Sequence, residues 1–208
     1  MNRCVIIVVG MLCFGCNLCS AQFVIMQGSA IQIPGEIVYN DGTTARANFE
    51  VVVVLHGFSV EYMQNKVRYF DENGKRHKLR PSEAKEIRFQ WREQEVRMIT
   101  RRAVHHTNKL RFMHLIIDGK VRLYEYIKTY RYSGRQGMSY ARIRTAVYWY
   151  LERDEDGTVI TPHSLGFRHQ MKNFFTGCET LTERLDAKVY KLREVPAIVT
   201  FYNQDCQK

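Results

Sequence analysis

The sequence predicts an α+β protein: an antiparallel, β-rich body followed by three short helices. Up to about residue 160, short runs of apolar residues alternate with polar ones, and Asp-Gly or Asn-Gly turns separate the runs. After Pro162, apolar residues recur at helical spacing instead. A third observation, an apolar stretch at the start of the chain, fits neither pattern and has to be explained first.

The chain opens with MNRCVIIVVGMLCFGCNLCSAQF, and Arg3 is the one charged residue in its first 21 positions. A short positive start, an apolar core and small residues at the end are the pattern of a secretory signal peptide. The sequence therefore predicts a signal peptide over residues 1–21, with cleavage between Ala21 and Gln22. The apolar run is short for a spanning helix, so we expect no transmembrane segment in the mature chain.

Four cysteines in this opening stretch leave two other interpretations open. A lipoprotein would carry acyl chains on a cysteine, here Cys16 or Cys19. Metal-cluster spacing is also present at Cys13, Cys16 and Cys19, although the apolar surroundings of an export signal argue against it. Unpaired cysteine behaves as a small apolar residue, so these cysteines need no chemistry.

The first half of the body predicts two hairpins and a further strand, at residues 31–39 with 49–55, 66–70 with 75–79, and 87–91. The continuous apolar run Phe49–Leu55 predicts a strand buried on both faces. Pro81–Glu86 has proline followed by good helix formers, which predicts one helical turn. The β-rich body as a whole is expected over residues 22–160, as a meander, two small sheets with a boundary near 101–108, or a barrel-like sheet.

The clearest hairpin joins residues 110–117 to 120–127 across the turn Asp118-Gly119. Alternation places Val121, Leu123 and Ile127 on one face of its second strand. A weaker strand precedes it at 96–102, an irregular connection is expected at 130–140, and further strands at 142–151 and 158–160. In the strand at 142–151 the apolar residues Ile143, Val147, Trp149 and Leu151 share one face.

Three short helices are expected in the C-terminal segment, residues 161–208. The first carries an apolar stripe from Phe167 to Phe175, the second follows Gly177, and the third has Pro196 in its first turn. In an oxidising compartment, the two cysteines left after export, Cys178 and Cys206, are most simply a disulfide.

Residues 120–150 form the most unusual stretch, with seven Lys or Arg, seven Tyr and a single acid. Arginines beside aromatic rings can bind phosphates and stack on sugars or bases. This predicts a ligand face on the sheet, made by Arg122, Tyr124, Tyr126, Arg131, Arg142, Arg144, Tyr148 and Tyr150. The alternative is an ordinary solvent face, because both residue types pack their stems across strands.

The net charge of +10 favours an anionic partner such as an anionic glycan or lipopolysaccharide. Nucleic acid is not expected, because export separates the protein from it. The sequence carries no zinc-protease, nucleophile-elbow or phosphate-loop motif, so no catalytic residue, metal site or cofactor is predicted. The oligomeric state is left open.

Several segments have a familiar layout: the hairpin Gly35–Gly42, the segment Lys66–Lys85, the hairpin Ile117–Tyr124, and Tyr202-Asn203 just before Cys206. In this layout the chain resembles a group of exported proteins of Gram-negative bacteria whose function is unknown. It departs from them at Glu179, where proline is common. The resemblance implies export, a β-rich body and a helical tail, and it carries over no catalytic residue.

We therefore expect a protein of the periplasm or outer surface of a Gram-negative bacterium. From the sequence we expect its role to be that of a non-enzymatic binding or structural module of the cell envelope. The alternatives are an enzyme that acts on an envelope polymer and a lipid-anchored lipoprotein with the same body.

Overall fold

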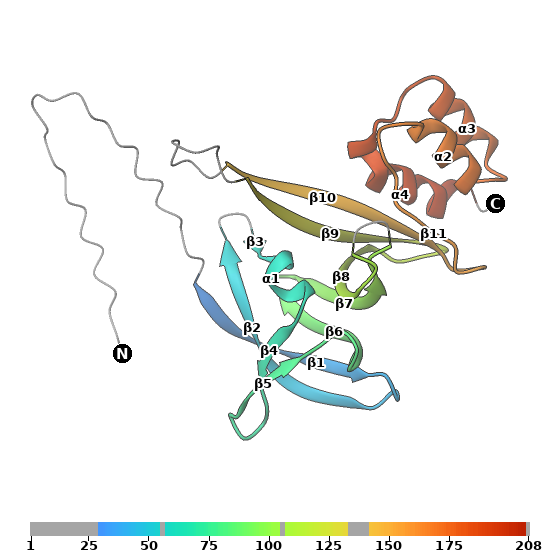
Figure 1. Cartoon of the computed structure of the whole chain (residues 1–208). Helices are drawn as coiled ribbons and strands as arrows, with labels where there is room; N and C mark the ends of the chain where they lie inside the picture. The colour runs from blue at the N-terminus through green and yellow to red at the C-terminus, as the bar shows by residue number, and fades with distance from the viewer. Residues whose placement is uncertain (1–28, 55–56, 105–106, 133–141, 207–208) are drawn as a thin grey trace, which may run out of the picture.

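One antiparallel sheet runs through most of the molecule in the computed structural model (Figure 1), which describes residues 29–54, 57–104, 107–132 and 142–206. The predicted signal peptide, its cleavage between Ala21 and Gln22, and lipidation of Cys16 or Cys19 all lie outside the described residues. The strand order is β11-β10-β9-β8-β7-β6-β1-β2-β4-β5, and β3 pairs with β2. Over the described residues this sheet is open, so it is neither two separate sheets nor a closed barrel.

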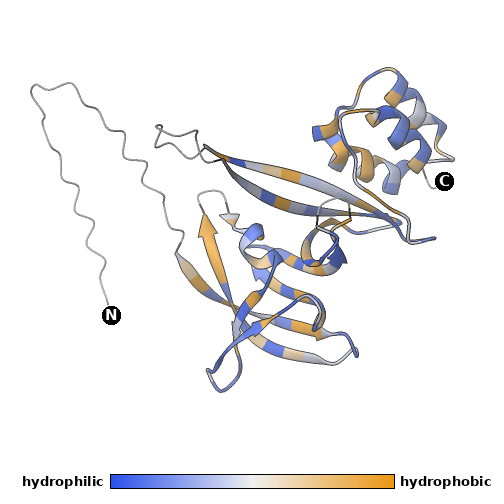
Figure 2. Ribbon diagram, in the orientation of Figure 1, coloured by the Kyte–Doolittle hydropathy of each residue, from blue (hydrophilic) through white to orange (hydrophobic). Residues whose placement is uncertain are grey.

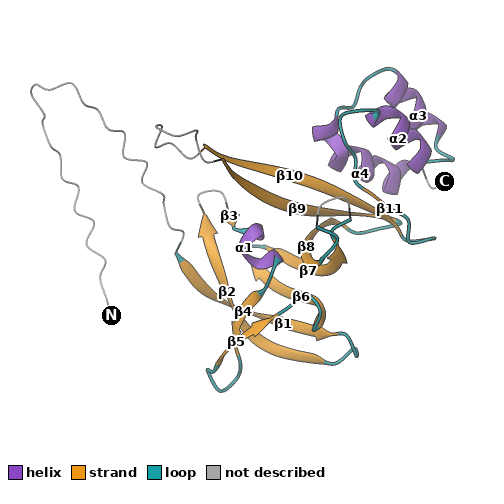
Figure 3. Cartoon of the chain, in the orientation of Figure 1, coloured by secondary structure: helices purple, strands orange, loops and turns teal. Residues whose placement is uncertain are grey.

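The strands are β1 (Ala30–Tyr39), β2 (Thr44–Val54), β3 (Gly57–Phe58), β4 (Val67–Phe70), β5 (Arg76–Leu79), β6 (Ala84–Trp91), β7 (Gln94–Arg102), β8 (Leu110–Ile117), β9 (Val121–Tyr132), β10 (Arg142–Arg153) and β11 (Val159–Ile160). The helices are α1 (Val60–Gln64), α2 (Phe167–Phe174), α3 (Glu179–Asp186) and α4 (Val195–Asp205), with a 3₁₀ turn η1 (Leu192–Glu194). The helices α2, α3 and α4 follow the sheet in the chain. Figure 3 shows them gathered at one end of it.

The turn chemistry of the first hairpin explains its formation. The Tyr39 N–H donates to the Thr43 carbonyl at 2.8 Å, and the Thr43 N–H donates to the Asp41 carboxylate at 2.9 Å. Gly42 takes a positive φ of 88°, which glycine adopts without strain. The residues predicted as turn residues therefore close the β1–β2 hairpin as expected.

Two local predictions for the first half of the body were wrong. The run Phe49–Leu55 is not buried on both faces, because Phe49 and Val51 are fully buried while Val54 is 45% exposed. The helical turn expected at Pro81–Glu86 is also absent from this described segment, since residues 81–83 form a tight turn and β6 begins at Ala84. Burial of Ala84 and Glu86 in the sheet outweighs their helix propensity.

The hairpin β9–β10 is the longest pair of strands. Twelve register pairs join it, from Tyr132 opposite Arg142 to Val121 opposite Arg153. Residues 130–132, expected in an irregular connection, therefore continue β9. Figure 1 shows this hairpin reaching past the rest of the sheet toward one side of the molecule.

The helical tail packs on the base of this hairpin. Val121, Leu123 and Leu151 form one buried cluster with apolar residues of α2, α3 and α4, including Met171, Leu181, Leu185, Ile198 and Val199. The hydropathy colouring of Figure 2 shows orange residues along all three tail helices. No helix in the described ranges is both long and apolar enough to cross a membrane.

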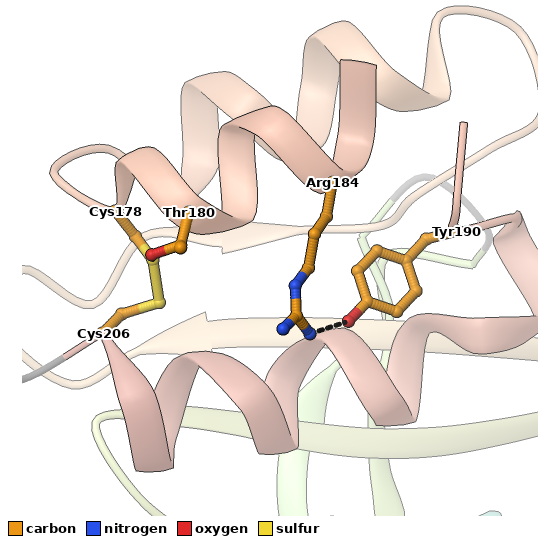
Figure 4. Close-up of a disulfide and its surroundings, with 5 residues drawn as sticks. All are labelled: Cys178, Thr180, Arg184, Tyr190 and Cys206. Carbon is orange, nitrogen blue, oxygen red and sulfur yellow. Dashed lines mark hydrogen bonds between the residues drawn. A yellow bond between two sulfur atoms is a disulfide. The ribbon is translucent and has the colours of Figure 1, made fainter. Parts of the chain in front are cut away.

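The predicted disulfide between Cys178 and Cys206 is present (Figure 4). Cys178 caps the start of α3 and Cys206 caps the end of α4, with their Cα atoms 5.3 Å apart. Nearby, Arg184 of α3 donates a 3.3 Å hydrogen bond to the Tyr190 hydroxyl. Short helices fray in isolation, so the bridge holds α3 and α4 together where each has few turns.

Candidate functional site

The pairing of β9 with β10 places residues of the predicted ligand face opposite one another. Tyr124 lies opposite Tyr150, and Tyr126 lies opposite Tyr148, as expected from the alternation along β9 and β10. Three of these four side chains are buried, with exposed fractions of 1% for Tyr124, 4% for Tyr126 and 1% for Tyr150. A ligand in solution therefore meets little of this part of the face.

These tyrosines are buried against residues of β7, β8 and the segment that follows β7. They form a cluster with Ile99 of β7 and Met113 of β8, and the Tyr150 hydroxyl donates a 2.7 Å hydrogen bond to the Val104 carbonyl. Burial, together with the hydrogen bond to Glu152, raises the pKa of Tyr124. These rings act in the core of the molecule rather than on its surface.

Arg122 is held in an ion-pair network. Its guanidinium contacts Asp118 and Asp154, and Glu152 lies 4.0 Å away. Glu152 also accepts a 2.7 Å hydrogen bond from Arg101. Because acids surround this arginine, its charge is largely neutralised and little of it remains for an anionic ligand.

The outer part of the hairpin holds the remaining predicted residues. Arg144 is exposed, and Tyr148 is half-buried with its hydroxyl 2.6 Å from that of Tyr130. That hydrogen bond, together with burial, raises the pKa of Tyr148 to about 12. Arg142 pairs with Tyr132 and Arg131 with Ile143 by backbone register, while the side chains of Arg131 and Arg142 lie outside the described part. Binding of a polyanion at this end of the hairpin stays a prediction.

A different feature is a cavity of about 920 Å³, which lies between β10 and the helical tail. We call it the β10 cavity. Its apolar lining comes from Val147, Trp149, Ile160, Pro162 and Leu192. Its polar lining comes from Glu125, Tyr148, Thr161, His163, Ser164, Gln170 and Arg193.

Four segments build the β10 cavity: β9–β10, the chain after β11, α2 and η1. The chain leaves the sheet early, because the β10–β11 ladder contains only the pairs Leu151–Ile160 and Glu152–Val159. Pro162 follows two residues later and has no N–H to donate to a ladder. The segment Thr161–Ser164 therefore separates from β10, and the cavity lies where the two part.

Polar contacts hold together the wall of the cavity that lies opposite β10. The Gln170 amide lies 2.6 Å from Nε2 of His163, and the His163 backbone N–H donates to Oε1 of Gln170 at 3.3 Å. On the side formed by β9 and β10, the Glu125 carboxylate lies 3.4 Å from Nδ1 of His114. The Glu125 and His163 side chains in the lining thus each have a contact that positions them.

Sequence reasoning missed this cavity, because its walls come from segments far apart in the chain. The sequence did show that Ile143, Val147 and Trp149 share an apolar face of β10, but only the structure shows that Ile143 is 57% and Val147 47% exposed. An apolar strand face left partly open is a common mark of a binding surface. No group of three or more potential metal ligands occurs among the residues that the structure describes.

Comparisons with protein-family models, with curated proteins and with solved structures found no match to this chain.

Proposed function

We propose that the chain is an exported, non-enzymatic binding protein of a Gram-negative cell envelope, and that it holds an apolar or amphipathic molecule in the β10 cavity. The carrying observation is the cavity itself. Its volume of about 920 Å³ and its mainly apolar lining are those of sites that enclose small ligands, which span roughly 300–1,000 Å³. A few polar side chains at such a site orient the ligand.

The disulfide supports the export part of the proposal. Disulfides persist in oxidising compartments and are rare where glutathione keeps thiols reduced. The bridge between Cys178 and Cys206 therefore agrees with a periplasmic or surface location. An intact mass that begins at Gln22 would support cleavage by a signal peptidase, whereas a mass beginning at an acylated Cys16 or Cys19 would make the protein a lipoprotein.

A binding role fits the cavity better than catalysis. An enzyme acting on an envelope polymer would need acids or histidines that converge on a reacting atom. In the β10 cavity, Glu125 contacts His114, and His163 contacts Gln170. These contacts fix the walls of the cavity rather than present a free acid–base pair.

Trp149 provides a direct readout of occupancy. The chain has two tryptophans, so replacing Trp91 by phenylalanine leaves Trp149 as the sole indole reporter. Titration with anilinonaphthalene sulfonate, an amphipathic dye, should change Trp149 emission with saturation. Val147→Glu, which puts a charge in the lining, should weaken dye binding by roughly tenfold or more.

Ile143→Glu is the matched control. Ile143 is an exposed aliphatic residue of the same strand and is not part of the lining. Dye affinity should be unchanged in this variant. Equal weakening by both substitutions, or no saturable response of Trp149, would contradict binding in the β10 cavity.

A further inference from the structure

We propose that the ligand of the β10 cavity is an extended polypeptide segment, which pairs as an added strand with the outer edge of β10. This inference rests on the proposed function, because it uses the same cavity. It goes further by assigning the chemical class of the ligand, a peptide backbone with apolar side chains at alternate positions.

The lining shows that a strand edge forms one wall. Val147, Tyr148 and Trp149 are consecutive residues, and all three line the cavity. Successive side chains of a strand point to opposite faces of a sheet. Three consecutive lining residues therefore mean that the cavity reaches the edge of the strand, where backbone N–H and C=O groups point. Glu125, which lies opposite Trp149 on β9, shows that the cavity also extends over the face that these two residues share.

The inner strand of the hairpin has its edge covered by side chains. Where β8 does not pair with β9, Gln64 bonds the backbone of Ile127, Glu61 accepts from the Thr129 N–H, and Asn203 bonds the backbone of Val121. Proteins cover edges in this way to prevent pairing with other strands. This covering shows that, where a strand edge of this fold is not paired with another strand, side chains bond its backbone groups.

The outer edge of β10 has no such cover. From Ile143 to Val147, no strand or side chain of the described residues bonds the backbone on the side away from β9. β11 pairs with β10 only at Leu151 and Glu152. A free edge that leads directly into an apolar cavity is the arrangement that binds peptides by strand addition.

The side chains along this edge set the preference of the site. Val147 and Trp149 lie two residues apart on one face of β10, and Ile143 continues that face toward the outer end of the hairpin. Residues directly opposite in an antiparallel pair share a face. A bound segment would therefore place apolar side chains at every second position against Val147 and Trp149.

The second wall favours a single segment over a second copy of this chain. The wall across the cavity from β10 is made by Thr161–Ser164, Gln170 and Leu192. A strand that enters between two walls fits as one extended segment, whereas the β10 edge of another copy would bring its own sheet and tail. A dimer through β10 is the competing outcome of the test below.

The test uses three blocked heptapeptides in which valine alternates with threonine, added to the full protein carrying Trp91→Phe. The first is unmodified, and the other two carry N-methyl groups on alternate backbone nitrogens, either the odd or the even set. In a paired strand, one set of N–H groups faces the partner and the other set faces away. The readouts are Trp149 emission and displacement of anilinonaphthalene sulfonate.

We expect the unmodified peptide to bind and displace the dye. One N-methylated isomer should lose roughly tenfold or more in affinity, and the other should bind like the parent. Val147→Glu should weaken the parent peptide as well. This pattern would support pairing through the backbone.

Other outcomes separate the two proposals. If the dye binds in the cavity but no peptide binds, or both methylated isomers bind like the parent, strand pairing is overturned while the cavity keeps its binding function. If neither dye nor peptide changes Trp149 emission, both proposals fail. Sedimentation showing a concentration-dependent dimer that the parent peptide does not dissociate would assign the edge to a second copy and overturn the peptide.

Discussion

Gln64 and Ile127 lie 63 residues apart in the chain and exchange two hydrogen bonds of 2.7 Å each. The side-chain amide of Gln64 donates to the Ile127 carbonyl and accepts from its N–H, as a neighbouring strand would. Pairing between β8 and β9 ends at His114 and Glu125. From that point α1 takes the place of a strand, and so a five-residue helix holds the long hairpin to the body.

Gln64→Ala should therefore destabilise the protein by roughly 2–3 kcal/mol. The substitution removes both bonds and leaves a backbone donor and acceptor of Ile127 without partners. Urea unfolding followed by circular dichroism measures the change. Gln90→Ala, at an exposed position of β6, should stay within about 0.5 kcal/mol of the native protein; a similar loss in both variants would contradict the role assigned to Gln64.

Gly119→Ala should displace the Asn203 side chain, which bonds the backbone of Val121 at the start of β9. A Cβ at this position would lie 2.6 Å from Nδ2 of Asn203, whose amide bonds the backbone of Val121. We expect a loss of roughly 2 kcal/mol in the native background and a clearly smaller loss in Asn203→Ala. Additive effects in this double-mutant cycle, measured by urea unfolding, would show that the two positions are independent.

Glu86 should make the folded state sensitive to acid. Its exposed fraction is 4%, and burial opposes ionisation, but the hydrogen bonds from Arg88 and Arg97 outweigh burial and hold the pKa of Glu86 below its usual value. A lowered pKa in the folded state gives stability that is fully present above the unfolded pKa, near 4.3. That stability is lost as pH falls through the folded value.

The expected result is a urea midpoint that is steady near neutral pH and falls below about pH 4.3. Glu86→Gln should be less stable at pH 7 and show a smaller fall in acid. Some fall should remain, because the pKa values of Asp118 and Glu152 are also lowered, by arginines that outweigh the effect of burial. An unchanged midpoint and an unchanged acid profile in Glu86→Gln would argue against this account.

Reduction of the disulfide should loosen the tail. The bridge closes a loop over a sequence separation of 28, which in the chain-entropy model stabilises the fold by roughly 3–4 kcal/mol. A reductant should lower the melting temperature and expose α3 and α4 to limited proteolysis. The Cys178→Ala, Cys206→Ala double variant should melt lower and no longer respond to reductant. A native protein that melts identically with and without reductant would contradict the prediction.

Turn chemistry and periodicity predicted most of the fold from the sequence. The turns that contain Gly42 and Gly119 are local signals with known backbone geometry. The β1–β2 and β8–β9 hairpins formed at these turns as expected. The apolar stripe of Phe167 and Met171 likewise predicted a helix. In contrast, α1 has five residues, which is too short for a period to be recognised.

The candidate site shows the limit of this reasoning. Alternation correctly predicted that Tyr124 and Tyr126 share a face, but it says nothing about which face another part of the chain covers. Residues of β7, β8 and the segment that follows β7 bury those rings, and no local pattern along β9 encodes these contacts. The β10 cavity depends on the point where Pro162 takes the chain away from β10, a relation between segments that only the fold brings together.

The bond between Asn203 and Val121 has a consequence for the order in which the molecule can form. The two residues are separated by 82 positions, so β9 emerges from the ribosome long before the residue that closes its end. Contacts at such separations form late and slowly. An exported chain that moves through a channel from its N-terminus would thus carry an unfinished sheet, and its native state would be completed only after α4 has arrived on the far side.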